Sequence, residues 1–331
     1  MKHGADIYKY AKKLHCAPSE ILDFSSNINS YHPSINIKVT QEMLVRYGDT
    51  SYKDLKKAIQ DKYQIKKKQI ALYNGATSAI DALFKTLKSK RVYLYAPLYG
   101  EYEKAVPKNM KIIKINRFKE INKRPKKNSL VVFVNPSTPD GKFYNLKKLF
   151  KIWEEQNCTV VIDESFLEFE SLHSIRKEIK KSQKLYVIQS FSKFYSCAGV
   201  RIGAIFSCEK NIKKLQTPLW NLSSFDTKFL TQRLLDSEFS KKSKKLHKKN
   251  KRELIEILED TKLFDEIFTS DSNFILVKST KASKIFTHLL KKKILVRSCE
   301  SFDFLNKTYL RFGVKDTKMH KKLKKALACI I

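Results

Sequence analysis

The chain has 331 residues, of which 42% are hydrophobic and 11% aromatic; this is the composition of a globular protein and excludes a disordered one. That length suffices for two domains with substantial cores. No apolar run approaches the roughly 18 residues of a membrane span, and residues 1–16 lack the apolar core of a signal peptide. Six cysteines are scattered without a CxxC pair, so we expect reduced thiols in the cytoplasm rather than disulfides or a metal site.

The formal charge of +34 raises the prospect of a nucleic-acid or anionic-membrane partner. Of the 67 basic residues, however, only ten are arginines, and the lysines are spread along the chain, as in "KKSKKLHKKNKR" at residues 241–252. A nucleic-acid reader usually concentrates arginines and aromatic side chains on one face. We therefore interpret the lysines as an ordinary solvated surface and expect neither a nucleic-acid nor a membrane partner.

Short apolar runs alternate with amphipathic segments along the chain. The predicted strands of a first sheet are residues 69–73, 91–95, 111–115, 130–134, 159–163, 185–189 and 202–206. Because these runs are rich in Val, Ile and Leu, with helical patterns between several of them, they predict a mostly parallel sheet covered by helices on both faces. One long basic helix is predicted from about 226 to 260. A smaller βαββα set follows, with strands at 273–277, 294–298 and 308–314.

The predicted fold class is therefore α/β with two domains. A large domain with a mostly parallel central sheet spans residues 31–225, and a smaller α+β domain spans residues 226–331. Residues 1–30 form an N-terminal arm that we expect to contribute to the active site.

Ligands of open parallel sheets bind at the carboxyl ends of the strands, and polar residues follow several of the predicted strands. After the first strand, "NGATSAIDALFKTL" runs from a turn containing Gly75 into a helix, whose free N–H groups suit a phosphate. Tyr99 follows the second strand, and the loop "NPSTPDGKF" follows the fourth. Asp163 closes the fifth strand, where it is either a cap for the next segment or part of a site.

Lys193 stands between two apolar runs in "VIQSFSKFYSCAGVRIGAIF", with Ser190 and Ser192 before it and Arg201 after it. A strand end that should be buried is a poor place for a surface charge. A buried amine with a depressed pKa can form a Schiff base with an aldehyde, and a nearby carboxylate can keep a pyridinium nitrogen protonated. Helix N–H groups, serine hydroxyls and an arginine can hold a phosphate dianion. Aldehyde, pyridine and phosphate together describe pyridoxal 5′-phosphate.

These stretches resemble the fold-type-I pyridoxal-phosphate enzymes, in particular the aminotransferase subgroup that contains histidinol-phosphate aminotransferase and threonine-phosphate decarboxylase. "SFSKFYSCAGVRIG" resembles the Schiff-base segment of that family, and "VVIDESFLEF" resembles its Asp-Glu-Ala-Tyr/Phe segment. The resemblance covers nearly the whole chain and implies an aspartate aminotransferase-like fold and a homodimer with shared active sites.

The resemblance also implies roles for individual residues. As catalytic residues it implies Lys193 for the Schiff base, Asp163 for the pyridine nitrogen and Tyr99 for stacking on the ring. The residues implied for the cofactor phosphate are Gly75, Ala76, Thr77, Ser190, Ser192 and Arg201, with Tyr47 reaching the cofactor phosphate of the neighbouring subunit.

Two positions depart from the pattern of the aminotransferases. The family loop is Asn-Pro-x-Asn-Pro-Thr-Gly, whereas this chain has "NPSTPDG", so Thr138 stands where an Asn usually bonds the 3′-oxygen of the cofactor ring. A threonine hydroxyl still donates one hydrogen bond, so we expect Thr138 to bind cofactor and substrate in a tuned site. Phe166 stands where aminotransferases tend to carry Tyr, and we associate this phenylalanine with the decarboxylase branch.

Substrate binding is predicted from two regions. Arg297 and Arg311 lie on otherwise apolar predicted strands, which favours an anion site over a pair of buried salt bridges. "KHGADIYKYA" and "ILDFSSNIN" resemble the threonine-phosphate decarboxylases, in which a His-Gly pair and an Asn contact substrate. That resemblance implies His3, Gly4 and Asn27 as further substrate-binding residues.

The expected function is a pyridoxal-phosphate-dependent carbon–carbon lyase of cobalamin biosynthesis. It would convert O-phospho-L-threonine to (R)-1-amino-2-propanol phosphate, or O-phospho-L-serine to ethanolamine phosphate; one methyl group separates these substrates, and the sequence does not decide between them. The alternative enzyme is a histidinol-phosphate aminotransferase working with 2-oxoglutarate. A third hypothesis, a nucleic-acid-binding protein on a degenerate enzyme scaffold, requires duplex binding that survives about 200 mM salt.

Overall fold

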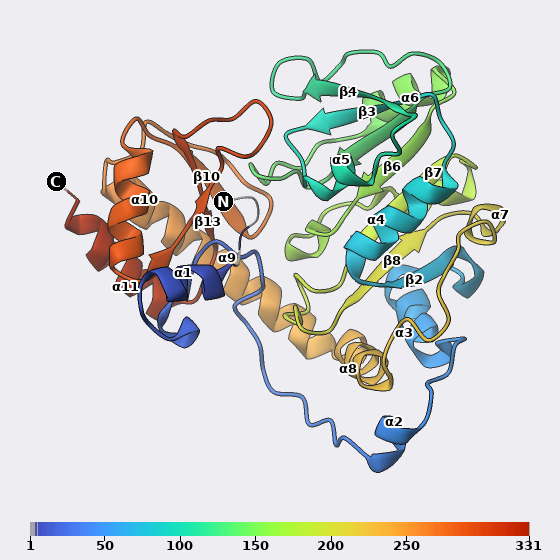
Figure 1. Cartoon of the computed structure of the whole chain (residues 1–331), viewed down its shortest axis with the longest axis horizontal. Coiled ribbons are helices and arrows are strands. Elements are labelled where there is room, and N and C mark those ends of the chain that lie inside the picture. The colour runs from blue at the N-terminus through green and yellow to red at the C-terminus, as the bar shows by residue number, and fades with distance from the viewer. Residues whose placement is uncertain (1–3, 5, 331) are drawn as a thin grey trace.

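The computed structural model describes residue 4 and residues 6–330, which fold into two lobes joined by a long helix (Figure 1). The larger lobe contains a seven-stranded sheet in the order β2-β8-β7-β6-β5-β3-β4. Its strands are β2 Ile70–Asn74, β3 Arg91–Ala96, β4 Lys111–Asn116, β5 Leu130–Val134, β6 Thr159–Asp163, β7 Leu185–Ser190 and β8 Ile202–Phe206. Only β8 runs antiparallel to its neighbours, so the predicted mostly parallel sheet is confirmed.

Alternate residues of β3 enter different cores, as expected for a sheet that is covered on both faces. Val92 and Leu94 pack in the core beneath α4, whereas Tyr93 and Tyr95 pack in the opposite core with Trp153 of α6. The helices of this lobe are α2 Gln41–Val45, α3 Lys53–Tyr63, α4 Gly75–Thr86, α5 Glu101–Ala105, α6 Lys147–Glu155, α7 Glu209–Ile212 and α8 Ser224–Leu235. Short 3-10 helices lie at Lys67–Gln69, Leu167–Phe169 and Ile175–Lys180.

The smaller lobe is built around a four-stranded antiparallel sheet in the order β12-β13-β10-β9. Its elements are β9 Glu266–Ile267, β10 Phe274–Lys278, α10 Ala282–Lys291, β11 Ile294–Leu295, β12 Arg297–Ser298, β13 Tyr309–Gly313 and α11 Thr317–Ala328. The predicted strand 294–298 is divided into β11 and β12, because its first half pairs with the N-terminal arm and its second half with β13.

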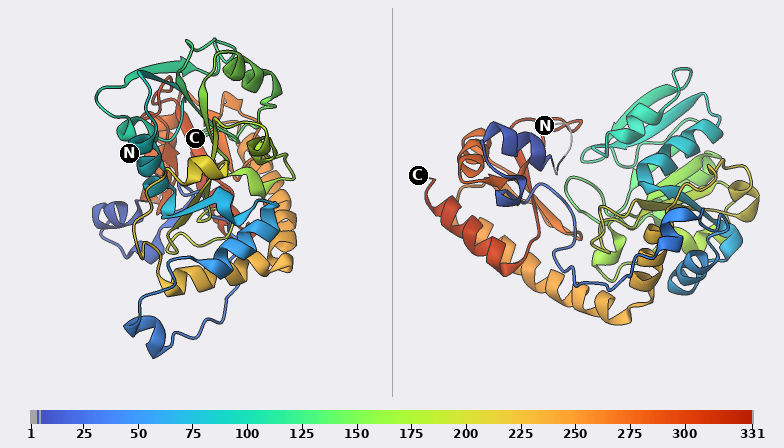
Figure 2. Two further views of the ribbon diagram at one scale, coloured as in Figure 1. Left: turned by 90° about the vertical axis from the view of Figure 1, so that its right-hand side faces the viewer. Right: turned by 60° about the horizontal axis from the view of Figure 1, so that its bottom comes forward.

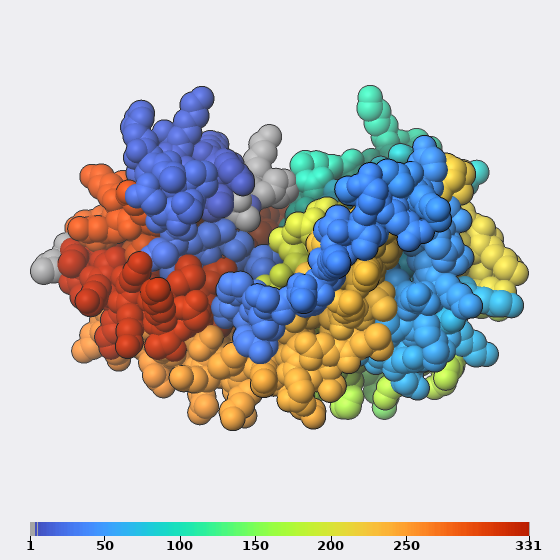
Figure 3. All heavy atoms as spheres, turned by 90° about the horizontal axis from the view of Figure 1, so that it is seen from below, coloured from blue at the N-terminus to red at the C-terminus, as the bar shows by residue number. Residues whose placement is uncertain are grey.

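The N-terminal arm packs on the smaller lobe before it crosses to the larger one. It begins with α1 Ile7–Lys13 and a 3-10 turn at Pro18–Glu20, and β1 Leu22–Asp23 then pairs in parallel with β11. Phe24 is fully buried in the core of the smaller lobe. The following segment runs across the surface formed by α8 and α9 toward the larger lobe (Figure 3).

The single long helix predicted from about 226 to 260 is wrong. The structure has two helices, α8 and α9 Ser237–Asp260, and Asp236 separates them. The carboxylate of Asp236 accepts a hydrogen bond from the backbone N–H of Phe239 at 2.8 Å, which caps the start of α9. α9 then runs from the larger to the smaller lobe (Figure 2). Within residues 4 and 6–330, no helix is both long enough and apolar enough to cross a membrane.

Candidate active site

A cavity of about 420 Å³ opens between the two lobes, at the carboxyl ends of the strands of the larger sheet. Both lobes and the N-terminal arm contribute to its wall. The predicted site residues that line it are Gly4, Asn27, Ala76, Thr77, Tyr99, Thr138, Asp163, Ser190, Lys193, Arg201, Arg297 and Arg311. Folding therefore gathers into one cavity most of the residues that the sequence singled out from distant parts of the chain.

Lys193 follows β7 and lines the cavity. Its side chain is partly exposed to the cavity and is otherwise closely surrounded by protein atoms. Burial lowers the pKa of Lys193 from 10.5 to about 8, with further lowering by Arg201 and Arg311 and an opposing effect of Asp163. The structure thus supplies an amine that loses its proton far more readily than an ordinary lysine.

Asp163 ends β6 and is buried beside Lys193. Its two oxygens are held separately: the hydroxyl of Tyr102 donates to Oδ2 at 2.7 Å and the backbone N–H of Ser165 donates to Oδ1 at 2.9 Å. Burial raises the pKa of Asp163, while these hydrogen bonds and the charge of Lys193 act in the opposite direction. Asp163 is therefore a fixed buried carboxylate suited to hold a proton on a ring nitrogen.

Sequence reasoning missed Tyr102. It is fully buried on α5, three residues after Tyr99, and its partner Asp163 lies 61 residues further along the chain. Nothing in the local pattern distinguishes Tyr102 from an ordinary core aromatic, so only the fold reveals that it positions Asp163.

The predicted phosphate turn is built from two close backbone approaches. Gly75 begins α4 with φ +77, and a Cβ there would lie 2.8 Å from Nη2 of Arg201. A Cβ on Gly203 would lie 2.5 Å from the backbone nitrogen of Ala76. Both positions need glycine, because a side chain at either one would displace the turn or the arginine. The start of a twelve-residue helix and a guanidinium thus face one end of the cavity, which suits a phosphate dianion.

The serines and Tyr99 complete this end of the cavity. Ser190 lines it, whereas Ser192 lies beneath and contacts Nη1 of Arg201 through its Oγ at 3.5 Å. The hydroxyl of Tyr99 lies 3.4 Å from Oγ1 of Thr77. These contacts place the predicted phosphate-binding residues together; their roles toward the cofactor remain predictions.

At the other end of the cavity, Arg297 and Arg311 stand directly opposite each other in the register of β12 and β13. Both are buried, with 2% and 5% of their surfaces exposed. Arg297 donates from Nη2 to Oγ of Ser301 at 2.8 Å and lies over the ring of Phe302. The pKa of Arg311 is lowered to about 10, chiefly by burial; the charge of Arg297 also lowers this pKa, whereas Cys299 and Asp23 raise it.

Arg311 is held by two oxygens and one ring. Its Nη1 donates to Oγ1 of Thr138 and its Nη2 to the carbonyl of Ser25, each at 3.1 Å, and the guanidinium lies 4.8 Å from the ring centre of Phe274. Within the part of the chain that the structure describes, no carboxylate lies within 4.0 Å of Arg311 in an ion pair. A buried guanidinium of this kind is suited to an anionic ligand.

The N-terminal arm reaches the same end of the cavity. A Cβ on Gly4 would lie 2.4 Å from the carbonyl oxygen of Ser25 and 3.7 Å from Nη2 of Arg311, so Gly4 packs directly against this site. Asn27 is 9% exposed, and its Oδ1 has no hydrogen-bond partner among residues 4 and 6–330. His3, predicted to bind substrate, lies outside the described residues.

Three further predictions concern Thr138, Phe166 and Tyr47. The hydroxyl oxygen of Thr138 faces Arg311, and its predicted bond to the cofactor ring stays a prediction. Phe166 lines the cavity and packs edge-on against Phe274. Tyr47 is 82% exposed and lies against Trp220 outside this cavity, with the ring centres 4.5 Å apart and the two rings tilted by 30°. Its reach into a neighbouring subunit remains a prediction.

The chain belongs to the aminotransferase class I and II family, whose model matches residues 19–328. It is 32% identical to the adenosylcobalamin biosynthesis bifunctional protein CobDQ of Leptospira interrogans over 97% of the chain, and it spans 40% of that relative's length. A protein of Caldanaerobacter subterraneus, provisionally named a threonine-phosphate decarboxylase, is 29% identical, with 95% of this chain and 89% of that one covered. A histidinol-phosphate aminotransferase of Flavobacterium johnsoniae is 25% identical, with 85% and 82% covered.

Solved structures agree with the family. The histidinol-phosphate aminotransferase of Clostridium acetobutylicum superimposes with a TM-score of 0.79 at 27% identity, covering 93% of this chain and 98% of that one. The histidinol-phosphate aminotransferase of Sinorhizobium meliloti, solved in complex with pyridoxal 5′-phosphate, has the same fold, with a TM-score of 0.80 at 16% identity, covering 98% of this chain and 94% of that one.

Members of this family are pyridoxal-phosphate-dependent enzymes, and the residues of this cavity fit the group. Lys193 offers a readily deprotonated amine and Asp163 a fixed carboxylate. The glycine turn at the start of α4 and Arg201 offer a phosphate site. A Cβ on Gly75 or Gly203 would clash with the atoms that form it. The chain is therefore an enzyme of the pyridoxal-phosphate-dependent aminotransferase family.

Proposed function

We propose that this enzyme is a decarboxylase of a phosphorylated amino acid, O-phospho-L-threonine or O-phospho-L-serine, that serves cobalamin biosynthesis. The observation that carries the proposal is the buried pair Arg297 and Arg311, which stand opposite each other in the cavity that also holds Lys193. Like charges directly opposite on a sheet destabilise it, so such a pair favours binding of a strongly charged anion. A substrate phosphate supplies that charge.

The proposal assigns a definite role to Lys193 and to Asp163. When bound, pyridoxal 5′-phosphate supplies an aldehyde for the substrate amine and a pyridine ring that accepts the electron pair released at the substrate Cα. Lys193, with its lowered pKa, is the amine that binds the cofactor and carries a proton at Nζ. Asp163, fixed by Tyr102, holds the proton of the pyridine nitrogen. Overall, the bond from Cα to the carboxylate breaks, carbon dioxide leaves, and a proton from Nζ of Lys193 takes its place.

Which bond of the substrate breaks depends on which group the protein clamps. If Arg297 and Arg311 hold the side-chain phosphate, the carboxylate is free to stand perpendicular to the cofactor ring and to leave. If an arginine held the carboxylate in the ring plane, the C–H bond would break and transamination would follow. The N-terminal segment that resembles the threonine-phosphate decarboxylases supports the first arrangement, because Ser25 bonds Arg311 and Asn27 faces the cavity. The two cobalamin-pathway and decarboxylase relatives support it as well.

Histidinol-phosphate aminotransferase is the second candidate, and the relatives and solved structures that carry this name favour it. Its substrate is also a phosphate ester and would use the same two arginines. It would, however, need a keto acid to complete each turnover, whereas a decarboxylase needs none.

The experiment is an assay of purified, cofactor-loaded protein with O-phospho-L-threonine and O-phospho-L-serine, with no keto acid present. Carbon dioxide release from either one supports the proposal, and the ratio of the two rates identifies the preferred substrate. Lys193→Ala serves as the control for chemistry at this site, and unphosphorylated L-threonine as the control for the phosphate. Glutamate formed from histidinol phosphate and 2-oxoglutarate, without carbon dioxide from the phospho-amino acids, would contradict the proposal.

A further inference from the structure

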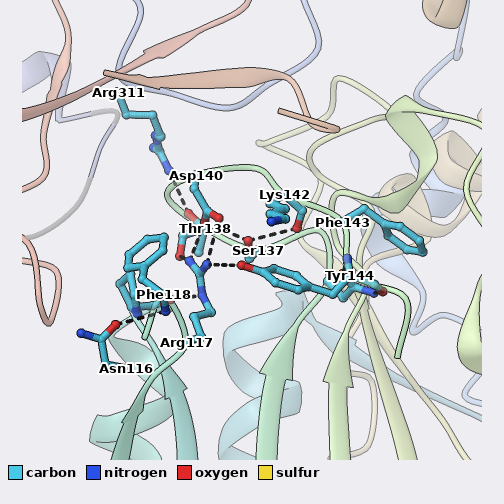
Figure 4. Close-up of polar contacts among 12 residues, drawn as sticks. Asn116, Arg117, Phe118, Ser137, Thr138, Asp140, Lys142, Phe143, Tyr144 and Arg311 are labelled. Carbon is cyan, nitrogen blue, oxygen red and sulfur yellow. Dashed lines mark hydrogen bonds and ion pairs between the residues drawn. The ribbon is translucent and has the colours of Figure 1, made fainter. Parts of the chain in front are cut away.

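Arg117 is a buried arginine that the sequence did not single out. It directly follows β4 and is 3% exposed. All five N–H groups that a guanidinium can donate have an acceptor. The acceptors are Oδ2 of Asp140 at 2.8 Å, Oδ1 of Asp140, the hydroxyl of Tyr144 at 3.2 Å, the carbonyl of Thr138 at 3.1 Å and the carbonyl of Pro97 at 3.3 Å (Figure 4).

These bonds tie together three strand ends at the edge of the sheet that bears the cavity. Pro97 follows β3, Arg117 follows β4, and Asp140 lies in the loop after β5. The hydroxyl of Ser137 donates to Oδ1 of Asp140 at 2.8 Å and adds a third bond to that carboxylate, within the loop. The backbone around Thr138 is therefore fixed by a buried ion pair in which every donor is satisfied.

The hydroxyl of Thr138 links this fixed loop to Arg311 through a hydrogen bond. Its Oγ1 accepts from Nη1 of Arg311 at 3.1 Å, and the carbonyl of Ser25 accepts from Nη2. Nε, the remaining donor nitrogen of Arg311, has no hydrogen-bond partner among the described residues. Two oxygens, one from the larger lobe and one from the N-terminal arm, thus set the plane of the guanidinium; Figure 4 shows the bond from Arg311 to Thr138.

We propose that Arg117 and Asp140 are positioning residues that, through Thr138, align Arg311 for the anionic group of the substrate. The inference rests on the proposed function, because it assumes that Arg311 binds that anion. It assigns the Thr138 side chain to the substrate end of the cavity, in place of the cofactor contact that its position in the sequence suggests. A planar guanidinium binds phosphate well only when its fork faces the oxygens, so orientation has a direct effect on affinity.

The experiment is calorimetric titration of inorganic phosphate into the cofactor-loaded protein, which needs no turnover. Thr138→Val removes the hydroxyl at nearly constant volume and is expected to weaken phosphate binding about tenfold. Thr138→Ser keeps the hydroxyl and is expected to bind within about twofold of wild type. Arg117→Met is expected to weaken binding as well, and the double variant with Thr138→Val to be no weaker than the weaker single variant. Arg124→Met removes an exposed arginine paired with Glu155 and is the matched control, with unchanged affinity.

Arg311→Met separates failure of this inference from failure of the proposed function. If Arg311→Met binds phosphate as wild type does, the proposed anion site is wrong. If Arg311→Met loses binding while Thr138→Val keeps it, the anion site stands and the positioning inference is overturned. A Thr138→Val variant that changes the visible absorbance of the bound cofactor but not the phosphate affinity would likewise overturn it, because Thr138 would then act on the cofactor.

Discussion

Replacing Lys193 by methionine is expected to stabilise the cofactor-free protein in a pH-dependent way. The structure lowers the pKa of Lys193 from 10.5 to about 8, chiefly by burial. A shift of that size corresponds to roughly 3 kcal/mol by which folding disfavours the ammonium form. Among the described residues, no carboxylate forms an ion pair with the ammonium of Lys193 that would offset this cost.

The sign of the pH dependence follows from the two pKa values. At neutral pH Lys193 is protonated in the folded and the unfolded chain, so the full penalty is present. As pH rises through about 8, the folded protein releases the proton while the unfolded chain keeps it up to 10.5, and wild type gains stability. The advantage of Lys193→Met in free energy of unfolding should therefore shrink, from about 3 kcal/mol at pH 7 to about 1 kcal/mol near pH 9.5.

Urea unfolding of the cofactor-free proteins across this pH range measures the difference. Any gain or loss from packing the methionine does not depend on pH, so the change with pH isolates the amine. Lys85→Met, at an exposed position, is the control and should show no such change. A difference between Lys193→Met and wild type that stays constant across the range would refute the argument that Lys193 is held as a disfavoured ammonium.

Two predictions concern the residues that shape the cofactor site. Tyr102→Phe removes one hydrogen-bond donor to Asp163 and raises the pKa of Asp163 further, so cofactor affinity should fall about tenfold in an absorbance titration; an unchanged affinity would mean that Tyr102 only fills space. Gly75→Ala places a Cβ 2.8 Å from Arg201 at φ +77 and should lower both cofactor affinity and the free energy of unfolding, the latter by about 1 kcal/mol. Gly100→Ala is the control, because among the described residues other than its two chain neighbours no atom lies within 4 Å of the new Cβ; an equal effect there would argue against the tight phosphate turn.

The large sheet was predictable because each strand is a nearly continuous apolar run, and such runs are local properties of the sequence. The break at Asp236 was not, because a capping carboxylate has the same sequence signature as a surface one. The division of residues 294–298 into β11 and β12 also escaped prediction, since it depends on which partner strand each half meets.

The site residues also differ in how far the sequence predicts them. Lys193 and Asp163 stand in local motifs whose spacing a reader of the sequence can recognise. Arg297 and Arg311 were predicted as an anion site. That they lie directly opposite each other on neighbouring strands depends on the strand register and on the loop between them. Tyr102 and Arg117 act on partners 61 and 23 residues away, and no local pattern marks either of them as part of the site.

The central claim is that this enzyme removes the carboxylate of a phospho-amino acid, and product analysis in deuterium oxide tests it most directly. Cofactor-loaded protein would be incubated with O-phospho-L-threonine without keto acid, and the products followed by nuclear magnetic resonance. We expect 1-amino-2-propanol phosphate with one deuterium on the carbon that lost the carboxylate, and carbon dioxide in equal amount; O-phospho-L-serine would give ethanolamine phosphate labelled in the same way. Deuterium exchange at Cα of intact substrate, with no carbon dioxide from either compound, would show that the C–H bond breaks instead and would contradict the account.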